Sequence, residues 1–308
     1  MRARTGDFPD RIGPCGHRFA APLREGRGNG VPAGGFPEVA PAFLDRTIRR
    51  LTLLATLLLA PFAAPQAGVM EPPSHLLCED LMSPTGIGAV RPRLSWWVLA
   101  GDARDVRQWA YQIVVASRAE LLSPGQADLW DSGKRKDSSS ACLYEGKSLA
   151  ARQVCWWAVR TADGKGEWSP WSTPGRFELG LLHNEDWAGA KWICGAAPDR
   201  RHQHFYFRKA FSLSEKQIVR GRVYVSACHQ HMLYVNGVPI GKGPNFAYPE
   251  HAYYQTFDIG PMLKPGSQNL LALRCHWFGG GQNRPTGRPG VILKAVIDLA
   301  DGSVMEIH

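Results

Sequence analysis

Leu233-Tyr234-Val235-Asn236-Gly237-Val238-Pro239-Ile240-Gly241 is the most informative stretch of this chain of 308 residues. Apolar runs lie on both sides of Asn-Gly, and a two-residue hairpin turn needs positive φ at both of its central positions, which these two residues tolerate. The stretch therefore predicts two antiparallel strands joined by a tight turn.

Runs of the same kind flank this hairpin, and together they predict a β-sandwich over residues 186–308. The further strands expected there are Phe205–Phe211 and Arg222–Ala227.

Residues 72–182 break into about seven short runs separated by turn residues such as Ser123-Pro124-Gly125. The expected strands are Leu76–Cys78, Leu94–Val98, Ala110–Ala116, Asp128–Asp131, Ala141–Tyr144, Val154–Thr161 and Arg176–Leu179. Long helical periodicity is missing, and the connections are too short for parallel crossovers. We therefore expect an all-β protein of two consecutive antiparallel sandwiches, the first immunoglobulin-like or fibronectin-III-like.

Tryptophans in this first region allow two interpretations. Their flat faces suit sugar rings, but adjacent pairs such as Trp96-Trp97 and Trp156-Trp157 point to opposite faces of a strand, which places one of each pair in the core. Packing and ligand binding both remain open from the residues alone.

The N-terminal segment has a different composition. Residues 1–45 are rich in Gly, Pro and Arg and lack apolar periodicity, so we expect disorder. Residues 46–67 combine arginines, the apolar run Leu51–Ala60 and small residues, the pattern of a signal peptide that is too short to span a membrane. A leader in this position suggests that the assigned start is too early and that translation begins near Phe43 or Leu44. We expect a secreted or periplasmic product.

Charge and cysteines point to no further cofactor or partner. The formal net charge is +9, but the basic residues after residue 67 are scattered, which argues against a nucleic-acid partner. Cys228, His229, His231, Cys275 and His276 would be the candidates for a metal site, yet Cys-x-x-Cys is missing and packing is the simpler role. We predict neither metal nor cofactor.

The order of several motifs resembles the N-terminal part of bacterial α-L-rhamnosidases of the glycoside hydrolase family 78 type. The motifs are Arg91-Pro92-Arg93-Leu94-Ser95-Trp96, Ala110–Ser117, Asp128-Leu129-Trp130-Asp131-Ser132-Gly133-Lys134, Trp157-Ala158-Val159-Arg160, Trp168-Ser169-Pro170-Trp171-Ser172 and Asp186-Trp187-Ala188-Gly189-Ala190-Lys191-Trp192-Ile193. The segments Tyr254–Ile259 and Leu263–Leu273 and a final strand at Val291–Ile297 continue the resemblance, which covers about residues 72–308. It implies an immunoglobulin-like domain and then a jelly-roll-like sandwich that helps substrate recognition, ahead of a helical barrel with the catalytic acids.

This resemblance implies a non-catalytic recognition and scaffold portion of a secreted enzyme that acts on rhamnose-containing glycans, with the missing catalytic domain as its partner. We expect the chain to stop inside the second sandwich and to be inactive alone. A free-standing carbohydrate-binding or adhesion module is the alternative.

The segment Arg274-Cys275-His276-Trp277-Phe278-Gly279-Gly280-Gly281 departs from the Gly-x-Gly-Trp-Tyr-like segment that the family commonly shows. Trp277 and Phe278 beside three glycines suggest an exposed stacking ledge, with His276, Asn283 and Arg284 as partners for sugar hydroxyls. The other interpretation is that one ring closes the sandwich.

Glycoside hydrolysis needs two carboxyl groups that face each other across the scissile bond, one with a raised pKa. The candidate acids lie at a junction or beside turns, where acids usually cap backbone groups; they are Asp128, Asp131, Glu185, Asp186, Asp298 and Asp301. We assign no catalytic residue.

Overall fold

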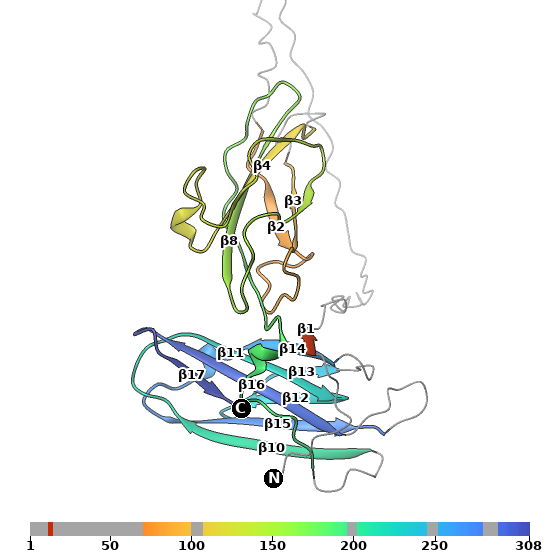
Figure 1. The fold of residues 1–308 in the computed structure, drawn as a ribbon, viewed down its shortest axis with the longest axis vertical. Helices are drawn as coiled ribbons and strands as arrows, with labels where there is room; N and C mark the ends of the chain where they lie inside the picture. Colours follow the sequence, from red (N-terminus) through yellow and green to blue (C-terminus); the bar gives the residue numbers. More distant parts are fainter. Residues whose placement is uncertain (1–11, 15–69, 100–106, 196–201, 245–251, 280–288) are drawn as a thin grey trace, which may run out of the picture. The chain divides into compact units, whose positions relative to one another are not determined.

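The computed structural model describes residues 12–14, 70–99, 107–195, 202–244, 252–279 and 289–308. These residues form β-strands and three short 3₁₀ turns, and none of them lies in an α-helix, which confirms the all-β class (Figure 1). The proposed signal peptide at 46–67 and the site candidates Asn283 and Arg284 lie outside the described residues.

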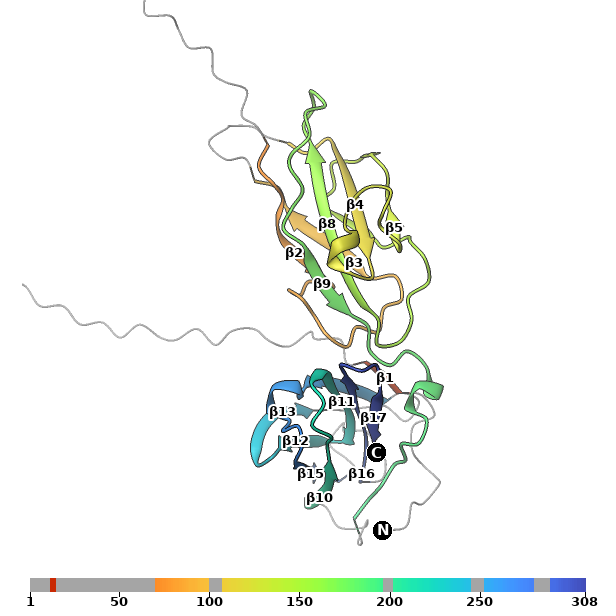
Figure 2. The same cartoon turned by 90° about the vertical axis from the view of Figure 1, so that its left-hand side faces the viewer.

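The first sandwich consists of two sheets. One has the order β2-β3-β7, and the other has the order β5-β4-β8-β9 with β6 beside β4. The strands are β2 (Ser74–Cys78), β3 (Arg93–Trp97), β4 (Ala110–Ala116), β5 (Trp130–Asp131), β6 (Arg135–Lys136), β7 (Ala141–Leu143), β8 (Val154–Ala162) and β9 (Gly175–Glu178). All pairings within these sheets are antiparallel, as expected from the short connections (Figure 2).

Alternation along β3 and β8 decides which tryptophans are buried. Trp96 and Trp157 are each 1% exposed, whereas Trp97 is 56% exposed. The buried rings pack with residues such as Tyr111, Ile113 and Phe177 between the two sheets. Core packing therefore explains one member of each pair, because side chains on successive strand residues point to opposite faces.

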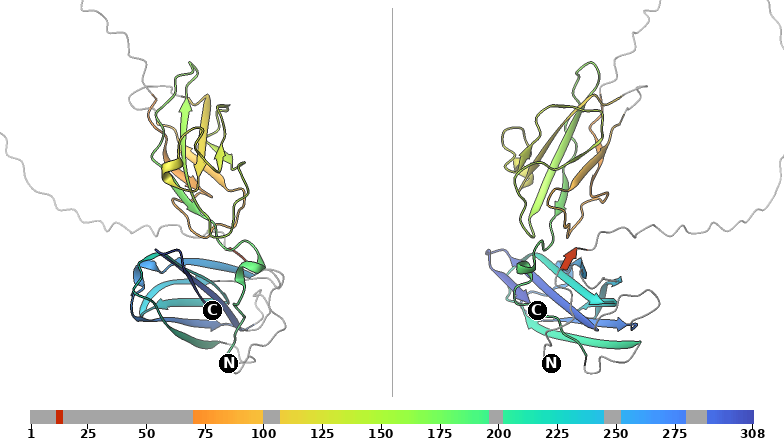
Figure 3. Two further views of the ribbon diagram at one scale, coloured as in Figure 1. Left: turned by 60° about the vertical axis from the view of Figure 1, so that its left-hand side comes forward. Right: turned by 45° about the vertical axis from the view of Figure 1, so that its right-hand side comes forward.

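The second sandwich also has two layers (Figure 3). One sheet has the order β10-β15-β12-β13, and the other runs β1-β14-β11-β16-β17. Their strands are β1 (Ile12–Pro14), β10 (Gln203–Ser212), β11 (Ile218–Cys228), β12 (Gln230–Val235), β13 (Val238–Pro244), β14 (Ala252–Asp258), β15 (Gln268–Trp277), β16 (Gly290–Leu299) and β17 (Val304–Ile307).

The predicted hairpin is formed by β12 and β13. Asn236 and Gly237 have φ values of 50° and 84°, so both turn positions are left-handed as the sequence requires. The side chain of Asn236 strengthens the turn, because its Oδ1 accepts a hydrogen bond of 2.9 Å from the backbone N–H of Leu270 on β15. Leu233 and Val235 are fully buried and join the core that both sheets share.

Two edge strands were not expected from the sequence. β17 pairs with β16, and β1 pairs in parallel with β14, although β1 falls within the segment predicted to lack structure. The unpaired backbone groups of a sheet edge accept any extended segment that reaches them, even one with no apolar pattern of its own.

Candidate functional site

The exposed face of the sheet β10-β15-β12-β13 carries the candidate site. Burial alternates along β15, where Leu273, Cys275 and Trp277 point into the core while Arg274 is exposed and His276 is half-buried. Since the side-chain period of a strand is two residues, Arg274 and His276 share the outer face.

Strand register brings residues distant in sequence beside these two. His276 is opposite His204 on β10 and Gln230 on β12. In the next row Arg274 is opposite Tyr206 on β10 and Met232 on β12, and Met232 is opposite Lys242 on β13. Directly opposite residues of antiparallel strands point to the same face, so two cross-strand rows form one surface.

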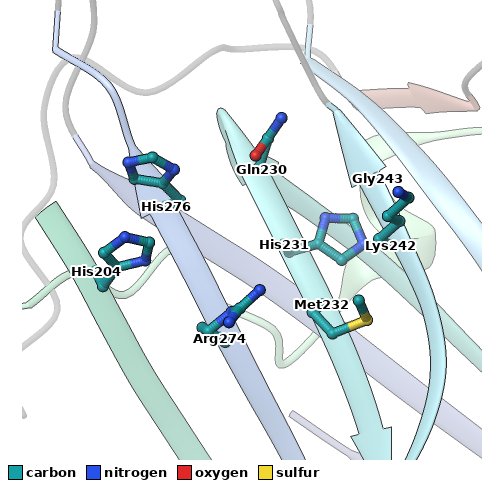
Figure 4. A pocket seen from close by; sticks show the side chains of 8 residues that line it. All are labelled: His204, Gln230, His231, Met232, Lys242, Gly243, Arg274 and His276. Atoms are coloured by element: carbon teal, nitrogen blue, oxygen red, sulfur yellow. The ribbon is translucent and has the colours of Figure 1, made fainter. Parts of the chain in front are cut away.

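These rows surround a pocket of about 460 Å³ (Figure 4). It is lined by His204, Gln230, His231, Met232, Lys242, Gly243, Arg274 and His276. A Cβ atom at Gly243 would overlap the side chain of Gln255, which explains the glycine at this wall. The volume lies in the range of small-molecule sites, about 300–1,000 Å³.

Rings gather at the end of β15. His204 and His276 stack with centroids 4.1 Å apart and an interplanar angle of 18°, and Phe278 lies 4.1 Å from His276. Burial lowers the pKa of His276, and electrostatic interaction with His204, His202 and Arg274 lowers it further. The lowered pKa favours the neutral imidazole, which has one N–H donor and one acceptor.

Trp277 does not form the exposed ledge suggested from the sequence. Its ring is 5% exposed and stacks on His229 with centroids 4.3 Å apart. The alternation of β15 turns this side chain inward, so it closes the sandwich, which is the other interpretation that the sequence allowed. Phe278 is half-buried, and its backbone N–H donates a hydrogen bond of 3.2 Å to Nδ1 of His229.

The carboxylates considered for hydrolysis accept hydrogen bonds in turns or form ion pairs. Asp186 Oδ2 accepts hydrogen bonds from the N–H groups of Leu182 and His183, and Asp128 accepts two from Ser117. Asp131 accepts one from the N–H of Gly133, and Asp301 accepts two from Ser303.

Asp298 is bonded to two arginines, at 2.6 Å from both Arg152 and Arg220. Burial alone would raise its pKa, but these hydrogen bonds and charges outweigh burial and lower it. A general acid in a glycosidase needs a shift in the opposite direction.

The possible metal ligands are spread between core and surface. Cys275 is buried in the core cluster, whereas His276 belongs to the outer face. Within the described ranges, no group of three or more His, Cys, Asp or Glu side chains could hold a metal ion.

In the same ranges, no helix is long and apolar enough to cross a membrane.

Sequence reasoning found His276 but missed Arg274, Lys242, His204 and Tyr206 as its neighbours. β10 and β15 pair although their partner residues are 56 to 74 positions apart in the chain, from Ser212 opposite Gln268 to Gln203 opposite Trp277. The proximity of these side chains follows only from the strand register. The sequence signal that could have helped is the alternation of polar and apolar residues within each strand, which predicts which side chains face outward.

Comparisons with known proteins agree with this architecture. Residues 73–183 match the model of the Rha78A-like, N-terminal immunoglobulin domain. An α-L-rhamnosidase of Formosa agariphila is 31% identical over 266 residues, which are 78% of this chain and 28% of that protein.

Two solved structures extend the match over both sandwiches. The α-L-rhamnosidase from Dictyoglumus thermophilum superposes with a TM-score of 0.69 at 28% identity, over 78% of this chain and 29% of the other. The enzyme from Aspergillus terreus gives a TM-score of 0.62 at 26% identity, over 77% and 28% of the respective chains.

The chain thus spans less than a third of the length of these relatives. Residues 73–183 thus match a Rha78A-like, N-terminal immunoglobulin domain, and across both sandwiches the chain is similar to part of several α-L-rhamnosidases.

Proposed function

We propose that this chain is the non-catalytic recognition and scaffold portion of a secreted α-L-rhamnosidase and that its second sandwich contacts rhamnose-containing glycans. The observation that supports the proposal is the pocket on the exposed face of β10-β15-β12-β13, where imidazole, amide and guanidinium groups surround about 460 Å³. Such groups bind sugar hydroxyls, as donors and acceptors at fixed positions.

Recognition would use His276 and Gln230 for hydroxyl groups, with the ring of Tyr206 as an adjacent apolar surface. Tyr206 is 71% exposed and is opposite Arg274 in the strand register. A Tyr ring at a binding surface offers a rigid apolar face and a polar tip at low entropic cost. Phe278 lies beside His276 and extends the same surface toward the end of β15.

Hydrolysis is assigned to a catalytic domain of the same enzyme and not to this chain. Glu178, the fully buried carboxylate, bonds to Arg222 and Arg176, and Asp298 bonds to Arg152 and Arg220. The hydrogen bonds and charges of its arginines lower the pKa of Asp298 despite burial, whereas the acid of a glycosidase needs a raised pKa. We further propose that the signal peptide expected at residues 46–67 directs export of the chain.

Binding to the purified chain tests the proposal most directly. Methyl α-L-rhamnoside and a rhamnose disaccharide are titrated by ligand-observed NMR against the wild type, His276→Ala and Trp97→Ala. Trp97 serves as the control, because it is an exposed ring on the first sandwich, away from the pocket residues. We expect weaker binding in the His276 variant alone.

The opposite pattern, in which only Trp97→Ala loses binding, would move recognition to the first sandwich. Release of aryl alcohol from an aryl α-L-rhamnoside by the purified chain, with contaminating enzyme excluded, would overturn the non-catalytic assignment. Sequencing the DNA downstream separates the scaffold from a free-standing binding module, since only the scaffold requires a reading frame for a catalytic domain.

A further inference from the structure

The sheet β10-β15-β12-β13 has an unusual charge distribution. Its four strands contain no Asp or Glu, yet they carry four Arg or Lys residues and three histidines. The cationic residues are Arg208, Lys209, Lys242 and Arg274, and the histidines are His204, His231 and His276.

The opposite sheet of the same sandwich differs, because there the basic residues are neutralised. Arg222 pairs with Asp258 at 2.7 Å, and Lys294 pairs with Glu306 at 3.0 Å. Neither Lys242 nor Arg274 has a carboxylate partner among the residues that the structure describes. Lys242 and Arg274 both line the pocket.

The geometry places these cations within reach of one ligand. Arg274 on β15 and Lys242 on β13 are separated across the sheet by one residue, Met232 on β12. Figure 4 shows Arg274 and Lys242 on the strands to either side of β12, with the stacked rings of His204 and His276 on the Arg274 side. The pocket wall thus has cations and imidazoles but no carboxylate among its lining residues.

We propose that this pocket binds the anionic group of an acidic sugar, either the carboxylate of a uronic acid or a sulfate ester, with Arg274 and Lys242 as its ligands. The proposal rests on the proposed function, which places a glycan on this face, and it adds the chemical class of that glycan. A neutral rhamnoside would leave both cations unpaired, whereas an anion would satisfy them.

Arginine and lysine have different roles in this arrangement. The planar guanidinium of Arg274 fits two oxygens of a carboxylate or sulfate at once, which fixes the orientation of the sugar. The Lys242 ammonium adds a flexible point charge from the other side of Met232. Losing one charge-assisted hydrogen bond should weaken binding by about tenfold, which corresponds to about 1.4 kcal/mol.

The experiment uses isothermal titration calorimetry with the full chain and matched ligands. Glucuronosyl-rhamnose is compared with its carboxyl-reduced counterpart, glucosyl-rhamnose, and with methyl α-L-rhamnoside sulfate as the second anionic arm. We expect at least one anionic ligand to bind about tenfold tighter than glucosyl-rhamnose. Which arm wins identifies the anion as a carboxylate or a sulfate.

Three variants test the residues. Arg274→Met and Lys242→Met should each reduce the preference for the anionic ligand by about tenfold, since they remove one charged partner. Arg208→Met is the matched control, because Arg208 is exposed on the same face of β10 but is not one of the pocket-lining residues. Added NaCl should weaken anionic binding in the wild type, as expected for an exposed ion pair.

The outcomes separate this inference from the proposed function. Equal affinity for glucuronosyl-rhamnose, the sulfate and glucosyl-rhamnose would overturn the anionic site but leave glycan recognition in place. An equal loss in Arg208→Met would overturn it too, because net charge and not the pocket would then explain binding. If cellobiouronic acid, which lacks rhamnose, binds as tightly as glucuronosyl-rhamnose, the anionic site stands and the rhamnose assignment of the proposed function fails.

Discussion

Arg222 donates two parallel hydrogen bonds to Glu178, from Nε to Oε1 and from Nη2 to Oε2, each 3.0 Å long. The carboxylate is fully buried and ends β9 of the first sandwich, while Arg222 is buried on β11 of the second. Bidentate arginine–carboxylate pairs combine strength with fixed geometry, so this pair ties the two sandwiches within one compact unit.

Glu178→Ala should therefore lower the free energy of unfolding by about 3 kcal/mol, because it breaks the buried pair and leaves Arg222 with the exposed Asp258 as its carboxylate partner. Arg222→Ala should cost less, since Arg176 still bonds to Glu178 at 2.6 Å. Urea unfolding measures both. Asp80→Ala, which breaks an exposed ion pair with Arg93, is the control and should cost less than about 1 kcal/mol. Equal losses for Asp80→Ala and Glu178→Ala would contradict the prediction.

Trp157→Ala should destabilise the protein by about 3–5 kcal/mol, the usual cost of removing a large buried aromatic ring. The ring is 1% exposed in the core of the first sandwich. Trp97→Ala removes a ring that is 56% exposed and should change stability by less than about 0.5 kcal/mol. Thermal melts of the two variants compare them directly. Similar melting temperatures would contradict the placement of Trp157 in the core and Trp97 on the surface.

Gly237→Val should weaken the β12–β13 hairpin by about 1–2 kcal/mol, because Gly237 has a φ of 84° and a β-branched residue is strained there. Gly237→Asn should cost much less, since Asn tolerates the left-handed region. A Cβ at this position meets no other atom, so steric crowding cannot explain a loss. Hydrogen exchange at β12 reports the effect, and equal protection in the two variants would contradict it.

Lowering the pH should remove the contribution that ionised Asp298 makes to the stability of the folded protein. Burial raises the pKa of this carboxyl, but bonds from Arg152 and Arg220 lower it by more, so its folded pKa is below its unfolded value. The stability it contributes is present above the unfolded pKa of about 4 and is lost as pH falls through the folded pKa. Asp298→Asn should be less stable than wild type at pH 7, and the gap should narrow below about pH 4. A gap that stays constant down to pH 2 would exclude this linkage.

Two buried thiols should resist alkylation. Burial raises the pKa of Cys155 and Cys275 to about 12 in both cases, so little thiolate exists at neutral pH. Iodoacetamide at pH 8 should modify the half-buried Cys194 first and these two only after unfolding. Peptide mass spectrometry follows each site, and early labelling of Cys155 in the native chain would show that its strand opens.

Local sequence chemistry predicted much of the fold. β4 has the expected bounds of Ala110–Ala116, and the Asn236-Gly237 turn has both expected positive φ values. β17 escaped prediction because Val304–Ile307 is too short to show a pattern, and its pairing with β16 supplies the order.

The candidate site was predicted only in part. His276 lines the pocket, but Trp277 points inward because the alternation of β15 assigns neighbours to opposite faces. Arg274 and Lys242 could not be linked beforehand, since their proximity depends on two strand registers that no local rule specifies.

Because side chains along β15 alternate strictly between two faces, residues on its outer face and residues on its core face can change independently in evolution. Substitutions at Arg274 or His276 alter what the surface attracts, whereas those at Cys275 or Trp277 alter how tightly the layers close. The outer face of such a strand can change its ligand preference with little effect on folding. A single inserted residue, however, would turn core residues outward and surface residues inward, and would disrupt both the pocket and the core.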